Sequence, residues 1–171
     1  MAAFITAVSA GIVALDLAII AAIVVLFTSK RSQFIGFVRS YAWLLIFLLA
    51  ACSIAGTLVM QYAGLLAPCM LCWWQRIFMY PLALIALVAL IKNSDVSKDA
   101  DYVLVLAIPG ALVALYQHLL QILPQGSLIP CDAANECAVR SVFEFGFVTI
   151  PWMALTVFAA LALIGFIARK R

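Results

Sequence analysis

The stretch from Ala67 to Pro81 reads APCMLCWWQRIFMYP. Two cysteines in a C-x-x-C pattern stand at its start, and a long apolar run follows them. The whole chain has 171 residues, of which 68% are hydrophobic and only 10% are charged. About a quarter of the residues in a soluble domain are charged. The composition therefore predicts an integral membrane protein whose C-x-x-C stands at the border of a membrane span.

Five apolar segments divide the chain, and we expect each to be a membrane-spanning helix. They cover residues 3–28, 41–63, 73–92, 102–123 and 147–168. Each is close to the ~20 residues that a helix needs to cross the hydrocarbon core. Helices are expected because lipid offers no hydrogen-bond partner to an open backbone. The predicted fold class is an all-α membrane protein. No basic patch interleaved with aromatic residues suggests a nucleic-acid partner.

The basic residues predict the topology. Eight of the ten lie in joints or at the chain end on one side of a five-pass chain: Lys30, Arg31, Arg39, Lys92, Lys98, Arg169, Lys170 and Arg171. The positive-inside rule then puts the N-terminus outside and the C-terminus in the cytoplasm. Two joints face outward, at about residues 63–72 and 123–146. They contain four of the five cysteines: Cys69, Cys72, Cys131 and Cys137.

The C-x-x-C pair is expected in the first turn of the third helix, because Pro68 suits a helix start. The positive end of a helix favours a thiolate and lowers its pKa. Arg76, four residues after Cys72, shares its helix face and adds a positive charge. These features favour a redox site. A structural disulfide, half of a zinc site, and an arginine that only reaches toward water remain open alternatives.

Cys131 and Cys137 enclose the polar segment DAANE, which predicts an exposed and reducible disulfide. Two cysteine pairs on one face favour thiol exchange between them. A static disulfide or a four-cysteine zinc site are the alternatives. No dinucleotide fingerprint, P-loop or haem motif provides an electron acceptor. A membrane quinone is the plain candidate, and Gln75 could donate a hydrogen bond to it.

Three polar or reactive residues lie inside apolar segments. His118 could relay protons or bind a ligand carbonyl, or could simply reach the interface. Asp16 is costly at mid-span, so we expect a neutral carboxyl hydrogen-bonded to a neighbouring helix; a proton site is the alternative. Cys52 is expected to be a small buried hydrophobic residue.

Four stretches resemble the DsbB family of disulfide-bond formation membrane proteins, particularly its short BdbC type. They are PCMLCWWQRIFMYP, LYQHLLQ, PCDAANECA and GFVTIPWMAL. The C-x-x-C precedes the loop pair, whereas the related vitamin K epoxide reductases have the opposite order. The resemblance implies a four-helix core at residues 41–171 with a basic tail. Residues 1–40 would add one N-terminal helix and a basic cytoplasmic joint.

The resemblance also implies roles for the residues. Electrons would pass from a DsbA-like thioredoxin-fold partner to the loop pair, then to the C-x-x-C, then to ubiquinone or menaquinone. Cys131 would form the mixed disulfide with the partner, and Cys137 would exchange with Cys69. Cys72 would contact the quinone ring, and Arg76 would bind a quinone oxygen.

The sequence therefore predicts a quinone-reducing thiol oxidase of the bacterial inner membrane, without a metal, that supports disulfide-bond formation. A non-enzymatic membrane module with static disulfides or zinc is one alternative. A vitamin K epoxide reductase-like enzyme is another. The reverse direction, reduction of exported disulfides, also stays open, because direction depends on the redox potentials.

Overall fold

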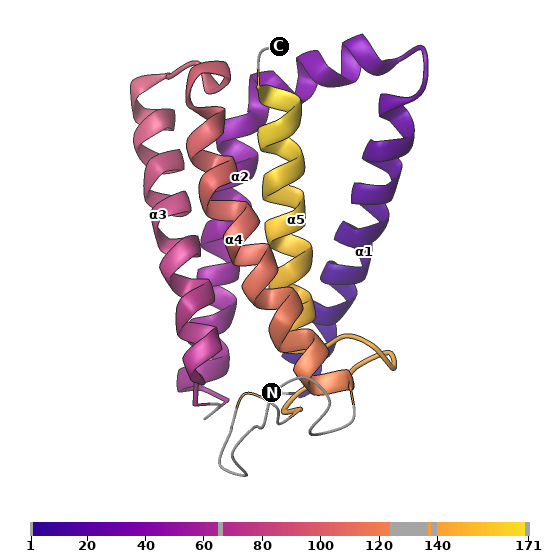
Figure 1. Ribbon diagram of the computed structural model, residues 1–171, viewed down its shortest axis with the longest axis vertical. Coiled ribbons are helices and arrows are strands. Elements are labelled where there is room, and N and C mark those ends of the chain that lie inside the picture. The colour runs from indigo at the N-terminus through magenta and orange to yellow at the C-terminus, as the bar shows by residue number, and fades with distance from the viewer. Residues whose placement is uncertain (1, 65–66, 124–136, 138–139, 170–171) are drawn as a thin grey trace.

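The computed structural model describes residues 2–64, 67–123, 137 and 140–169. These residues form five helices: α1 (Ala2–Leu26), α2 (Arg31–Tyr62), α3 (Met70–Lys92), α4 (Val96–Ile122) and α5 (Ile150–Ala168). All five are long and apolar enough to cross a membrane (Figure 1). The predicted fold class, an all-α membrane protein with five spans, is confirmed.

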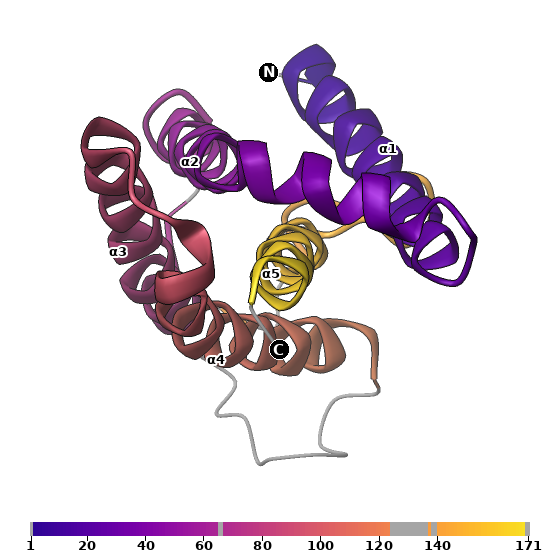
Figure 2. The same cartoon turned by 90° about the horizontal axis from the view of Figure 1, so that it is seen from above.

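Two helices begin well before the apolar segments that predicted them. α2 begins at Arg31 and α4 at Val96, where we expected residues 41 and 102. The Asp95 side chain caps α4 by accepting a hydrogen bond from the Ser97 amide at 3.0 Å. A polar first turn is compatible with a helix when its backbone is capped, so apolar content alone underestimates helix length. The first turns of α2 run across one end of the bundle (Figures 1 and 2).

α5 is the central helix of the bundle. It contacts α1, α2 and α4, and Figure 2 shows the other helices around it. Its approach to α4 is close at Gly110, where an added Cβ would lie 2.4 Å from Cε1 of Phe158. Small residues allow such close packing between membrane helices.

α1 is attached to α5 through Asp16. Nε1 of Trp152 donates to Asp16 Oδ2 at 3.2 Å, and Oγ1 of Thr156 donates to Oδ1 at 2.7 Å. The expected hydrogen bonding of Asp16 to a neighbouring helix is confirmed. The prediction for Cys52 is wrong, because its side chain is exposed. In a membrane protein an apolar span need not be buried within the protein, since lipid tails are as apolar as the core.

The two ends of the bundle differ in chemistry. The first residues of α1, α3 and α5 lie at one end, and the last residues of α5 lie at the other (Figure 1). At the C-terminal end, Nη2 of Arg39 donates to the Arg169 carbonyl at 3.0 Å. Arg169 in turn forms an ion pair of 3.0 Å with Asp101. Basic side chains therefore mark the end opposite to the C-x-x-C.

Candidate functional site

The C-x-x-C pair stands at the beginning of α3. Cys69 is the N-cap, with an extended backbone (φ −73°, ψ 173°), and Met70 is the first helical residue. Cys72 therefore lies in the first turn, as predicted, whereas Cys69 lies one residue before the helix and Pro68 before that. The two sulfur atoms are 3.3 Å apart and share a hydrogen bond, so the pair is in the dithiol form.

The two thiols are not equivalent. The hydrogen bond with Cys72 holds the pKa of Cys69 below its ordinary value, although burial and a hydrogen bond with Cys137 act in the opposite direction. Cys69 also stands at the positive end of α3, where a thiolate is favoured. Cys69 therefore carries negative charge more readily than an ordinary cysteine thiol.

A glutamine on α4 links the dithiol to the rest of the site. Nε2 of Gln117 donates to the sulfur of Cys69 at 3.3 Å and to that of Cys72 at 3.6 Å. Its Oε1 accepts a hydrogen bond of 2.7 Å from Nε2 of Gln75. Gln117 is buried and was missed in the sequence. The feature that could have identified it is a polar side chain within an apolar segment, directly before His118.

Arg76 is buried one turn after Cys72, and its guanidinium finds a partner on another helix. Nη1 donates to Oε1 of Gln61 at 2.7 Å, and the guanidinium lies 5.2 Å from the centre of the Trp73 ring. The expected polar partner of Arg76 is therefore Gln61 on α2, rather than a sulfur. Gln61 was also missed, because the end of an apolar segment is an ordinary place for a glutamine.

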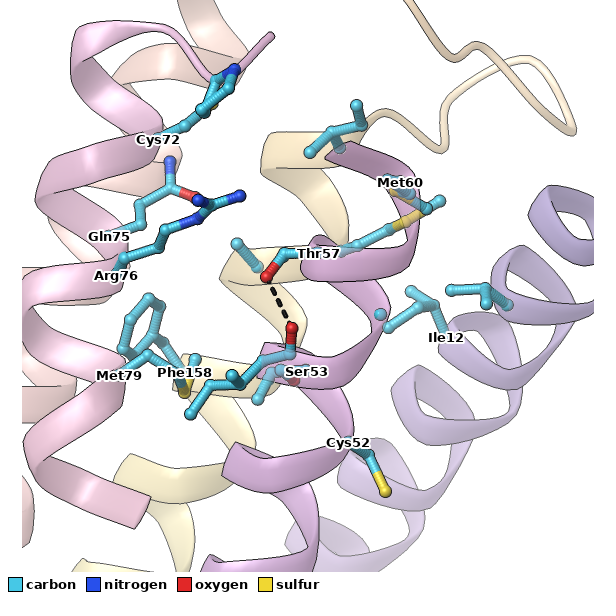
Figure 3. Close-up of a pocket in the computed structure, with 18 of the residues that line it drawn as sticks. Ile12, Cys52, Ser53, Thr57, Met60, Cys72, Gln75, Arg76, Met79 and Phe158 are labelled. Carbon is cyan, nitrogen blue, oxygen red and sulfur yellow. Dashed lines mark hydrogen bonds between the residues drawn. The ribbon is translucent and has the colours of Figure 1, made fainter. Parts of the chain in front are cut away.

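A cavity of about 480 Å³ lies between the helices, and its lining includes Cys69, Cys72, Gln75, Arg76 and Gln117. Cys72, Gln75 and Arg76 point into this space from α3, and Met79 and Phe158 lie deeper (Figure 3). Most of the other lining residues are apolar. A cavity of this size with a few polar groups at one end suits a ligand with a polar head and an apolar body. At the polar end of the cavity, Arg76 and Gln75 provide hydrogen-bond donors.

His118 lies apart from this arrangement. Its Nδ1 is 3.0 Å from Oγ1 of Thr149, the N-cap residue of α5. Its ring lies 5.0 Å from the ring of Trp152. His118 is buried and does not line the cavity, so in this structure it joins α4 to the start of α5.

Cys137 is the described residue of the second cysteine pair. It is buried, and it lies close enough to Cys69 for its side chain to raise the pKa of the Cys69 thiol. Nε2 of Gln121 on α4 donates to its carbonyl at 3.3 Å. The structure thus places Cys137 near the C-x-x-C, while Cys131 lies outside the described residues. Within the described ranges, no group of three or more His, Cys, Asp or Glu residues is arranged to hold a metal ion.

Comparisons with known proteins identify the family. The family model described as "Disulfide bond formation protein DsbB" matches residues 39–168. The chain is 36% identical to "SPbeta prophage-derived disulfide bond formation protein B" of Bacillus subtilis, over 75% of this chain and 85% of that protein. It is 38% identical to "Disulfide bond formation protein C" of the same organism, over 64% and 78% of the two chains.

A relative from a distant bacterium covers more of the sequence. The chain is 32% identical to "Probable disulfide formation protein" of Chlamydia pneumoniae, over 80% of this chain and 97% of that protein. No solved structure matches the chain. The family model begins within α2, so α1 lies outside the matched residues.

Proposed function

Because the chain belongs to the DsbB family of disulfide bond formation proteins, we propose that it re-oxidises an extracytoplasmic, DsbA-like thioredoxin-fold protein and passes the electrons to a membrane quinone. Family membership supports a disulfide oxidoreductase role. Our proposal adds the direction, the acceptor and the residues. It takes residues 41–171 as the catalytic core and residues 1–40 as an addition to it.

The thiol chemistry starts at the loop pair. A partner thiolate attacks Cys131 of the Cys131–Cys137 disulfide, which forms a mixed disulfide and releases Cys137 as a thiolate. Cys137 then attacks Cys69 of the Cys69–Cys72 disulfide and releases the Cys72 thiolate. The effect of the Cys137 side chain on the pKa of Cys69 supports this exchange, because it indicates that the two residues lie close to each other.

Two further exchanges complete the transfer. The second partner thiol displaces Cys131, so the partner leaves with a disulfide. Cys131 then attacks Cys137, restores the loop disulfide and releases Cys69. The partner has lost two electrons and two protons, and Cys69 and Cys72 have gained them.

The acceptor side rests on the cavity. A quinone, when bound, would accept the two electrons and two protons that leave the dithiol. Arg76 and Gln75 would hold its polar head beside Cys72, and the apolar walls would hold its tail. Gln117 keeps both sulfur atoms oriented by donating to them. His118, which we had expected to bind the cofactor, would instead position α5 through Thr149.

One observation carries the proposal: the same dithiol lies near Cys137 on one side and borders an apolar cavity with a buried arginine on the other. Neither a static disulfide nor a vitamin K epoxide reductase-like reaction is favoured by any contact of the described residues. The charge pattern supports insertion in the bacterial inner membrane with the cysteine end outside.

The thiol side can be tested in membranes. We expect membranes that contain the protein to oxidise a reduced, DsbA-like protein catalytically, and to lose this ability when their quinones are extracted. Addition of quinone should restore it. Reduction of the partner's disulfide by the same membranes would show the reverse direction. Undiminished oxidation after quinone extraction would rule out a quinone as acceptor.

A further inference from the structure

α1 lies outside the part of the chain that the family model matches, yet it borders the cavity. Val8, Ile12 and Leu15 are among the lining residues. Ile12 is buried and points toward the space beside Met60 of α2 (Figure 3). The additional helix is therefore part of the cavity wall, although a four-helix core alone would contain the dithiol and Arg76.

The hydrogen bonds of Asp16 determine which face of α1 points toward the cavity. It lies one helical turn after Ile12, so the two residues share a face. Its carboxyl accepts hydrogen bonds from Trp152 and Thr156 of α5. Rotation of α1 would take the carboxyl away from these donors and into lipid, which is costly. The opposite face carries exposed apolar side chains such as Leu17, which is 63% exposed.

The chemistry of the wall indicates which part of a ligand α1 meets. The α1 residues that line the cavity are all apolar, whereas the polar side chains that line it come from other parts of the chain. The polar head of a quinone would therefore lie by α3, and its isoprenoid tail would lie by α1.

We propose that α1 forms the tail-binding wall of the quinone cavity and that Asp16 is the positioning residue that holds it against α5. This inference rests on the proposed function. It assigns the additional helix a role in selecting long-tailed quinones over short-tailed ones. Without the hydrogen bonds of Asp16, the cavity would open sideways toward lipid between α1 and α5.

Photochemical labelling tests the placement of the tail without using turnover. The probe is a ubiquinone analogue with a diazirine in its isoprenoid tail, photolysed with the purified full-length protein. We expect adducts in the peptide that contains residues 8–15, and competition by unlabelled long-tailed ubiquinone. Saturable adducts confined to α2–α5 would overturn the inference and leave the proposed function standing. Absence of any saturable binding would overturn both.

Substitutions of Asp16 test the positioning role. In Asp16→Ala we expect α1 labelling to fall and the KM for long-tailed quinone to rise, each by up to about eightfold. This factor corresponds to the combined loss of two hydrogen bonds of average strength within a membrane. The KM for a tailless quinone should not change. Asp16→Asn keeps an acceptor oxygen and should retain most of the labelling. Leu17→Ala, at the exposed face, should match the wild type.

The yield of the mixed disulfide distinguishes a folding defect from a loss of positioning, because the thiol reaction does not involve α1. Asp16→Ala should still form the mixed disulfide with a DsbA-like protein at the normal yield. If that yield is normal but α1 labelling and KM equal those of Leu17→Ala, the positioning role is wrong. If the yield is lost, Asp16→Asn decides: the inference fails if its KM values for tailed and tailless quinones rise by the same factor.

Discussion

Replacing Cys72 by alanine should raise the pKa of Cys69. The hydrogen bond with Cys72 is the largest influence that lowers this pKa, and the sulfur atoms are 3.3 Å apart. A hydrogen bond to a charged group contributes about 1.5–3 kcal/mol. Loss of this hydrogen bond should therefore raise the pKa of Cys69 and, at a pH below that pKa, reduce the fraction of thiolate by about 10- to 100-fold.

The assay is the rate at which iodoacetamide alkylates Cys69 as a function of pH, with the label located by peptide fragmentation. Cys52, Cys131 and Cys137 are replaced by alanine in every variant. This keeps the background constant, because the hydrogen bond with Cys137 raises the pKa of Cys69. Only the thiolate reacts, so below the pKa alkylation should become about 10- to 100-fold slower in Cys72→Ala.

Cys72→Ser is the matched control, because its hydroxyl can still donate to the Cys69 sulfur. We expect the midpoint of its pH profile to stay near that of the parent, at a clearly lower pH than the midpoint of Cys72→Ala. Equal midpoints in the alanine and serine variants would show that the hydrogen bond with residue 72 does not lower the pKa of Cys69. The low pKa of Cys69 would then have to come from the helix end or from Gln117.

Further substitutions test separate parts of the account. Arg76→Ala should slow quinone reduction at least tenfold while leaving the mixed disulfide with the partner unchanged; wild-type turnover would remove Arg76 from the acceptor site. Cys131→Ser should abolish the trapped partner complex, and a normal yield would move that role to Cys137. Gly110→Ala should destabilise the protein by about 1–3 kcal/mol in detergent unfolding, because its Cβ would overlap the buried Phe158 ring. An unchanged unfolding midpoint would show that the α4–α5 contact adapts at no cost.

The sequence predicts the spans and the place of the dithiol because these depend on local properties. Apolar length identifies the five helices, and the position of the C-x-x-C before an apolar run places it at a helix start. The start of α2 was missed for the same reason: residues 31–40 are helical but too polar to count as a span. Local composition does not distinguish a spanning turn from one that crosses the end of the bundle.

The partners of the polar residues could not be predicted, since they lie on distant helices. A buried arginine or aspartate indicates that some partner exists. It does not indicate that Arg76 meets Gln61, or that Asp16 meets Trp152 and Thr156. Gln117 acts through its register on α4 relative to α3, which only the packed structure provides.

The central claim is that electrons from an extracytoplasmic dithiol reach a quinone through Cys69 and Cys72. The most direct measurement mixes the purified protein anaerobically with a reduced DsbA-like protein and ubiquinone, and follows the loss of quinone absorbance and of partner thiols together. We expect one quinone to be reduced for each partner disulfide formed, and none to be reduced with Cys72→Ser. Partner oxidation without quinone loss, or equal quinone loss in Cys72→Ser, would show that electrons do not take this route.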